Sequence, residues 1–123
     1  MTAGAARPRR PTVDLVHRET LDRVVCRLQV PTGDAFPSSH FPDLPIVPGM
    51  MLVDWAVDIA ALYFDLGRFQ GVPTAKFRRP LRPGETVDLA LDWQPDVGRL
   101  RYAYRLGEVE CARGTLEFVR DVV

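Results

Sequence analysis

Lysine, cysteine and histidine are all scarce in this chain, and it has no long uncharged hydrophobic run. Lys76 is the only lysine among the 16 basic residues, and 16 acidic residues bring the formal net charge to zero. Balanced charge gives no reason to expect a nucleic-acid partner, and 46% hydrophobic residues are ordinary for a globular protein. The most apolar stretch, from Met50 to Phe64, contains two aspartates and is too short to cross a bilayer. We therefore expect no membrane association.

The two cysteines, Cys26 and Cys111, lie far apart, and neither belongs to a Cys-x-x-Cys motif. No other cysteine or histidine lies near them at the spacing of metal ligands, so we expect no metal site. Both fall in segments that resemble strands, where a reduced cysteine packs as a small hydrophobic residue. Reduced thiols, and the lack of an apolar leader in residues 1–11, predict a cytoplasmic protein. Residues 1–11 themselves are predicted to be a flexible tail.

Proline separates the first part of the chain from a hydrophobic helix. Five prolines fall in residues 31–48, a density that excludes regular structure over much of this loop. Pro48 suits the first turn of a helix, because its missing N–H is not needed there. In residues 50–64 only Asp54 and Asp58 are not apolar. This pattern predicts a helix that is buried on most sides and that ends near Gly67.

Alternation of apolar and polar residues predicts strands over most of the remaining chain. The predicted strands cover residues 12–16, 23–30, 74–79, 85–93, 99–106 and 109–119. One buried helix with mostly antiparallel strands makes an α+β domain, and we expect one such domain at residues 12–120. A curved sheet of five or six strands wrapped around the helix buries it most economically. A partner subunit is the natural cover for the side of the helix that the sheet leaves open.

His40 and Asp54 lie on either side of the predicted helix start and supply two groups that can handle protons. Imidazole titrates near neutral pH, and a carboxyl group in an apolar wall favours its neutral form. The helix N-terminus between them offers unpaired N–H groups, and Gly49 permits close approach of a carbonyl oxygen. Taken alone, His40 is explained as a hydrogen-bonding loop residue and Asp54 as the partner of an arginine. Their joint spacing around Pro48 and Gly49 favours catalysis.

The same residues carry a family resemblance. The loop and helix start read His40-Phe41-Pro42-Asp43-Leu44-Pro45-Ile46-Val47-Pro48-Gly49, with Asp54 five positions later. Residues 75–85 read Ala-Lys-Phe-Arg-Arg-Pro-Leu-Arg-Pro-Gly-Glu. Both stretches are similar to motifs of the hot-dog-fold 3-hydroxyacyl-(acyl carrier protein) dehydratases, and above all to the thioester dehydratases of aryl polyene biosynthesis. The resemblance extends from about Thr12 to Phe118.

The resemblance implies dehydration of 3-hydroxyacyl thioesters to trans-2-enoyl thioesters in fatty acid or polyene- and polyketide-type biosynthesis. The substrate would be carried on the phosphopantetheine of an acyl carrier protein, and no further cofactor is implied. His40 would be the base, Asp54 the acid or the residue that orients water, and the Gly49 N–H the oxyanion donor. Three further residues would line the substrate site: Phe41, Pro48 and Asp58. In relatives, the histidine and the acid of one site come from different subunits, so we expect a homodimer or a higher oligomer.

Three positions depart from the family pattern. Asp43 stands in place of the usual glycine, and Asp58 stands where a glutamine is frequent. Asp54 replaces the commoner glutamate, as in the isomerising branch of the family. Asp54 and Asp58 lie at i, i+4 on one helix face, and two close carboxylates resist being charged together. Either their pKa values split or Asp58 is satisfied by another group.

A basic cluster follows the helix, formed by Lys76, Arg78, Arg79 and Arg82. It is explained equally well as a charged edge strand that resists aggregation, or as a docking site for an acidic carrier protein and its phosphate. Two other functions stay open beside dehydration. The protein could be a non-catalytic hot-dog subunit that binds acyl carrier protein or pairs with a catalytic paralogue, or it could be an acyl thioesterase.

Overall fold

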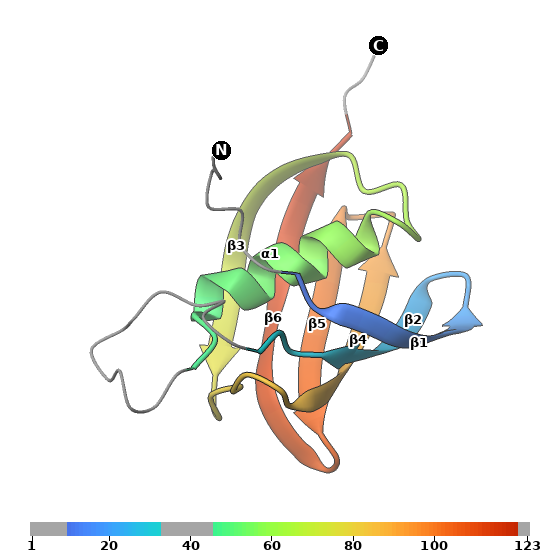
Figure 1. Cartoon of the computed structure of the whole chain (residues 1–123). Helices are drawn as coiled ribbons and strands as arrows, with labels where there is room; N and C mark the ends of the chain where they lie inside the picture. The colour runs from blue at the N-terminus through green and yellow to red at the C-terminus, as the bar shows by residue number, and fades with distance from the viewer. Residues whose placement is uncertain (1–9, 33–45, 121–123) are drawn as a thin grey trace, which may run out of the picture.

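A computed structural model describes residues 10–32 and 46–120 as one helix lying across the concave side of a curved sheet (Figure 1). The elements, in chain order, are β1 (Thr12–Thr20), β2 (Arg23–Gln29), α1 (Gly49–Ala60), β3 (Arg68–Phe77), β4 (Thr86–Gln94), β5 (Arg99–Leu106) and β6 (Val109–Val119). The six strands form one sheet in the order β1-β2-β4-β5-β6-β3, and every neighbouring pair is antiparallel. This confirms the predicted α+β class and the wrapped central helix.

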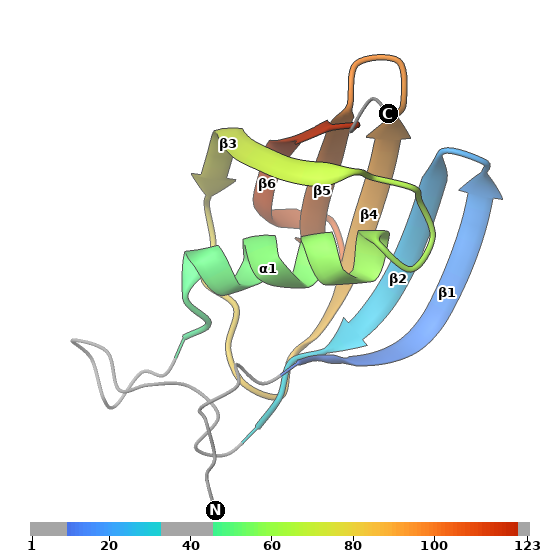
Figure 2. The same ribbon diagram turned by 90° about the horizontal axis from the view of Figure 1, so that it is seen from above.

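The alternation in the central strands decides which side of the sheet packs on the helix. In β4 and β5, every second residue is buried, and these residues share one face of the sheet. Their side chains pack against the helix residues that face the sheet, and together these side chains form the core of the domain. The buried residues of these two strands are Val87, Leu89, Leu91, Trp93, Leu100, Tyr102 and Tyr104. Seen from above, α1 lies on this face, and β3 curls over it (Figure 2).

The helix is shorter and less buried than the sequence predicts. It ends at Ala60 with Ala61 as its C-cap, so the predicted end near Gly67 is wrong. Gly67 instead comes directly before β3 and has a positive φ of 88°. A Cβ added at Gly67 would lie 2.7 Å from the Val119 carbonyl oxygen. Residues 62–66 connect the end of the helix to Gly67. Within this connection, the ring of Phe64 packs on the ring of Trp93, with ring centroids 6.4 Å apart. No helix within residues 10–32 and 46–120 is long and apolar enough to span a bilayer.

Two strands extend beyond their predicted bounds. β1 was predicted to end at residue 16, but it continues to Thr20, which pairs with Arg23, so only two residues connect β1 to β2. β3 begins at Arg68 and not at Thr74, because a register shift between Gly71 and Thr74 accommodates Pro73 in the strand. Proline is tolerated there because β3 is an edge strand with a bulge. The additional residues of β3 include Phe69 and Val72, which line a pocket together with residues of the helix.

The turn after the helix is held by a side chain from the opposite edge of the sheet. Arg18 of β1 donates hydrogen bonds to the carbonyl oxygens of Leu21 (2.7 Å) and Tyr63 (2.9 Å). Its guanidinium carbon also lies 5.9 Å and 5.6 Å from the ring centroids of Tyr63 and Phe64. These contacts tie edge strand β1 to the segment that follows the C-terminal end of α1.

Candidate functional site

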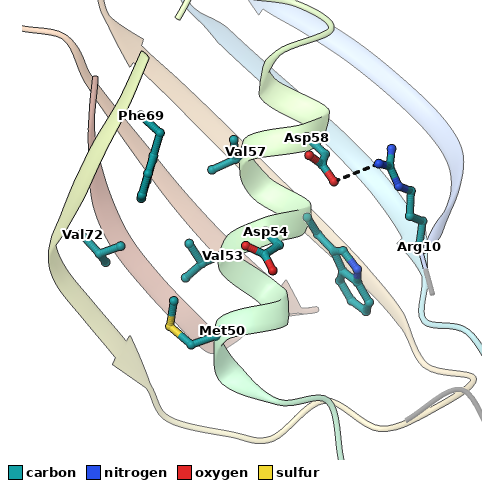
Figure 3. Close-up of a pocket in the computed structure, with 9 residues that line it drawn as sticks. Arg10, Met50, Val53, Asp54, Val57, Asp58, Phe69 and Val72 are labelled. Carbon is teal, nitrogen blue, oxygen red and sulfur yellow. Dashed lines mark ion pairs between the residues drawn. The ribbon is translucent and has the colours of Figure 1, made fainter. Parts of the chain in front are cut away.

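The open side of the helix and strand β3 enclose a pocket of about 630 Å³. In Figure 3, Met50, Val53 and Val57 point from α1 toward Phe69 and Val72 of β3. This half of the pocket is apolar. On the other side of the helix the pocket reaches Asp58 and Arg10, and Asp54 lies between the two halves. A carboxylate therefore sits at the junction of an apolar wall and a charged one.

Asp54 is exposed in the single chain, which corrects the prediction of a carboxyl group buried in an apolar wall. The physical reason is the geometry of α1, whose buried face carries Leu52, Trp55 and Ala56 while Asp54 lies on the open face. No ion pair to Asp54 is present among the described residues. The alternative in which Asp54 pairs with an arginine is therefore not supported within this part of the chain. Desolvation of this carboxyl group would require a second molecule over the open face.

Asp58 is the carboxylate that has a partner. Its Oδ2 lies 3.5 Å from a guanidinium nitrogen of Arg10, and the two side chains are 45% and 74% exposed. At this exposure the pair contributes little to stability. Asp58 therefore has an arginine as its partner, which is one of the two alternatives open for this residue. Arg10 was assigned to the flexible tail, so nothing in its sequence context identified it as a pocket residue.

No side chain in the described part of the chain caps the N-terminus of α1. Pro48 occupies the N-cap position without a side-chain hydrogen bond, and the Met51 amide donates to the Pro48 carbonyl oxygen at 3.0 Å. Within the described residues, the amides of Gly49 and Met50 have no hydrogen-bond acceptor. First-turn N–H groups point back along the helix axis and carry its positive end. The helix start therefore has the donors that a developing oxyanion needs.

A second hollow of about 370 Å³ surrounds this N-terminus, and Met50 lines both hollows. Its lining is almost entirely apolar and includes Val47, Gly49 and Phe77. A Cβ added at Gly49 would lie 2.8 Å from Cζ of Phe77, so the glycine lets this ring approach the helix start. The ring of Phe77 is half exposed and lies against the position that a Cβ of residue 49 would take.

Two of the residues assigned to the site, His40 and Phe41, lie outside the described residues. The same is true of Asp43. The structure therefore brings together Pro48, Gly49, Asp54 and Asp58 on one helix, and the position of His40 relative to Asp54 stays a prediction. Among residues 10–32 and 46–120 there is no cluster of three or more histidine, cysteine or acidic side chains that could hold a metal ion.

Two residues of the basic cluster pair with carboxylates of the fold, and two do not pair with a described residue. Arg79 donates two hydrogen bonds to the Glu85 carboxylate, both at 2.9 Å, and Glu85 also accepts from the Arg82 amide at 2.7 Å. This pairing lowers the pKa of Glu85. Arg78 lies 3.5 Å from Glu110. The charges of Arg78 and Arg79 are thus largely used within the fold, whereas the side chains of Lys76 and Arg82 form no ion pair with a described residue.

The sequence missed two features of this site. Val72 was not assigned to a strand, because Gly71 and Pro73 flank it and both disfavour regular strands. Tyr104 was assigned only to a strand face, yet its hydroxyl donates a 2.6 Å hydrogen bond to the Leu52 carbonyl oxygen in α1. Alternation places a tyrosine on the buried face, but the sequence does not say which carbonyl group its hydroxyl reaches.

Comparison with known proteins agrees with this geometry. Residues 16–115 match the family described as ApeI-like, ApeI dehydratase. The 3-hydroxyacyl-(acyl-carrier-protein) dehydratase FabZ of Oenococcus oeni is 31% identical over 111 residues, which cover 80% of each protein. FabZ of Anaeromyxobacter sp. (strain K) is 31% identical over 100 residues, which cover 69% of this chain and 64% of that protein. The chain therefore spans less than two thirds of the length of that relative.

Solved structures show the same fold. The dehydratase heterocomplex ApeI:P from Xenorhabdus doucetiae matches with a TM-score of 0.83 at 24% identity, over 91% of this chain and 100% of the matched chain. An uncharacterised protein from Erwinia carotovora subsp. atroseptica matches with a TM-score of 0.72 at 26% identity, over 87% of this chain and 94% of that one. With its central helix, its antiparallel sheet and this family match, the chain belongs to the ApeI-like dehydratase family and has the hot-dog fold.

Proposed function

We propose that this protein dehydrates 3-hydroxyacyl thioesters, carried on acyl carrier protein, to trans-2-enoyl thioesters. One observation carries the proposal. A single helix of a dehydratase-family chain presents Asp54 to a largely apolar pocket, and it presents the amides of Gly49 and Met50 at its N-terminus. None of these groups has a hydrogen-bond or ion-pair partner in residues 10–32 and 46–120. Dehydration of a thioester needs an acid and an oxyanion site at a fixed separation. Asp54 lies five positions after Gly49 in the helix, a rise of about 7.5 Å.

Each step of the proposed reaction is assigned to one residue or group of this chain. The imidazole of His40 takes the α-proton, and the electron pair moves onto the thioester oxygen, which the helix N-terminus stabilises. When the electrons return, the C–O bond at the β-carbon breaks, and the Asp54 carboxyl group protonates the departing hydroxyl. One molecule of water leaves, and no thiol is released. The apolar wall of Met50, Val53 and Val57 holds the acyl group.

A second subunit would complete the site. The open face of the domain exposes large hydrophobic side chains: Met50 is 60% exposed, Phe69 is 46% exposed and Phe77 is 50% exposed. Covering this face in a homodimer would bury them and would desolvate Asp54, which favours the neutral acid. In such a dimer the Asp54 of one subunit would meet the His40 of the other. Size-exclusion chromatography with light scattering tests this, and a monomer with full activity would contradict it.

The reaction class is tested by mass spectrometry on a panel of 3-hydroxyacyl carrier proteins, in which the product is lighter by one water. His40→Ala and Asp54→Ala should fold normally and lose nearly all turnover. Asp65→Ala is the matched control, because this exposed carboxylate pairs with Arg120 at 3.4 Å and does not line the pocket. Full turnover in either site variant would reject the role given to that residue. Release of free thiol in place of water would identify a thioesterase.

Carrier docking is assigned to Lys76 and Arg82, the two residues of the basic cluster whose side chains form no ion pair with a described residue. Because Arg78 and Arg79 already pair with carboxylates, they contribute less to the attraction of an acidic partner. Lys76→Glu and Arg82→Glu should raise KM for carrier-bound substrates, while a small thioester without carrier protein keeps its KM. Arg105→Glu on β5 is the control for a change of charge. If Lys76→Glu and Arg82→Glu have the same KM for carrier-bound substrates as Arg105→Glu, the docking role of Lys76 and Arg82 is rejected.

A non-catalytic subunit is the second candidate, and one observation favours it. The similar chain from Xenorhabdus doucetiae belongs to a dehydratase heterocomplex. In this case the purified protein would bind acyl thioesters and dehydrate none of them, whatever the chain length. Mixing with a catalytic paralogue would then give activity that neither protein has alone.

A further inference from the structure

Tyr104 joins the sheet to the first turn of the helix. Its ring is fully buried on β5, and its hydroxyl donates to the Leu52 carbonyl oxygen at 2.6 Å. Tyr102 lies two residues earlier on the same strand face, 6.0 Å away between ring centroids, and is 2% exposed. Its hydroxyl has no hydrogen-bond partner among the described residues. The strand thus carries two buried tyrosines that differ in whether the hydroxyl reaches the helix.

The Leu52 carbonyl group starts a chain of hydrogen bonds that runs to the helix N-terminus. This carbonyl and the Val53 N–H belong to one peptide unit, so a donor on the carbonyl makes the N–H a stronger donor. In an α-helix that begins at Gly49, the Val53 N–H bonds to the Gly49 carbonyl group. The Gly49 carbonyl shares its peptide unit with the Met50 N–H. That amide is one of the two at the helix start without an acceptor in the described chain.

We propose that Tyr104 is a positioning residue for the dehydration reaction, and that it strengthens the Met50 N–H as a second oxyanion donor beside Gly49. The inference rests on the proposed function. The hydroxyl polarises the series of hydrogen-bonded peptide groups that ends at the Met50 N–H. It also fixes the distance between the first helical turn and β5. Asp54 follows Leu52 by only two residues, so the same bond sets the position of the acid relative to the sheet.

The state of the phenol is suited to this role. Burial, with smaller contributions from Tyr102, Cys26 and Asp54, raises the pKa of Tyr104 well above its ordinary value. The hydroxyl therefore keeps its proton, and remains a donor, over the whole pH range in which a histidine base would work.

The test compares Tyr104→Phe with Tyr102→Phe, which both remove one buried hydroxyl from β5. Removing an oxyanion donor typically lowers kcat by about 10²- to 10³-fold, and cooperativity strengthens a hydrogen bond by roughly 10–30%. The loss of polarisation alone should therefore lower kcat by about two- to fivefold in Tyr104→Phe, with KM for a small thioester unchanged. Tyr102→Phe should keep the kcat of the unmodified protein. Equal kcat values in both variants would overturn the proposal.

A measurement without substrate separates this inference from the proposed function. In ¹⁵N-labelled protein, the Met50 amide proton should shift upfield in Tyr104→Phe and stay in place in Tyr102→Phe. If no form of the protein dehydrates any thioester, the proposed function fails, and the Met50 shift still tests the hydrogen-bond chain. If Tyr104→Phe does not fold, 3-fluorotyrosine at position 104 provides a stronger donor and should move the Met50 proton downfield. A Met50 proton that moves in neither protein overturns the inference.

Discussion

Gly49→Ala should separate stability from activity. The backbone of Gly49 is helical and has no positive φ, so alanine can adopt it without strain. Alanine is favoured over glycine within a helix by about 1 kcal/mol, and by less in the first turn. The opposing cost comes from Phe77, because the new Cβ would lie 2.8 Å from its Cζ, closer than real contacts allow. That ring is half exposed and can move by the few tenths of an ångström required.

The two contributions nearly cancel in the free energy of unfolding. We expect a net change within about 1 kcal/mol, which for a domain of this size shifts Tm by roughly 4 °C at most. Activity should change far more, since the added methyl group stands where a thioester carbonyl must approach the amides of the helix start. Loss of one oxyanion donor lowers kcat by about 10²- to 10³-fold.

Differential scanning calorimetry and turnover of a 3-hydroxyacyl thioester measure the two effects on the same sample. Phe77→Ala combined with Gly49→Ala is the control, because it removes the clash and leaves the methyl group in the substrate path. Activity that returns in the double variant would mean that the glycine serves only the packing of Phe77. Unchanged kcat in Gly49→Ala would refute the oxyanion site at this helix end.

Three further predictions concern stability and reactivity. Arg18→Ala removes two hydrogen bonds and two ring contacts from a partly exposed site, and should lower the free energy of unfolding in urea by about 1–2 kcal/mol. Hydrogen bonding to Arg79 lowers the pKa of Glu85, so its stabilising effect is present above the unfolded-state pKa and is lost as pH falls through the folded-state pKa. Glu85→Gln should therefore be less stable at neutral pH and equal to the unmodified protein in acid, and a constant difference across a pH series would disprove the pairing. Burial raises the pKa of Cys26 to about 11, and Cys111 is also buried, so a thiol reagent at neutral pH should label both only as fast as the protein opens.

The sequence predicts the sheet better than the helix. Alternation located β4 and β5 closely, because each has one buried and one polar face and the period of 2 is visible in their residues. β6 also has its predicted bounds, although the neighbouring residues Cys111 and Ala112 are both buried. The end of the helix was predicted too late. Apolar residues continue through Phe64, and hydrophobicity alone does not distinguish a helix from the packed turn that follows it. The start of β3 was missed because glycine and proline in an edge strand read as a break.

In the candidate site, the features that have a local cause were predicted from the sequence, and the features that depend on the packing of the whole domain were not. Pro48 and Gly49 mark a helix start in sequence as well as in structure, since the N-terminal position of proline follows from its own missing N–H. The environment of Asp54 has no such local cause. The residues around it in the chain are apolar, yet its position on the helix turns it away from the core.

The exposure of Asp54 links the catalytic proposal to assembly. A carboxyl group must carry its proton in order to protonate a departing hydroxyl, and removal from water favours this neutral form. In the proposed mechanism, one chain carries Asp54 and the amides of the helix start on α1, and a covering subunit would remove Asp54 from water. It follows that dilution below the dissociation constant of the dimer should abolish turnover even where the monomer stays folded. Turnover per subunit that is independent of protein concentration down to the monomeric range would contradict this coupling.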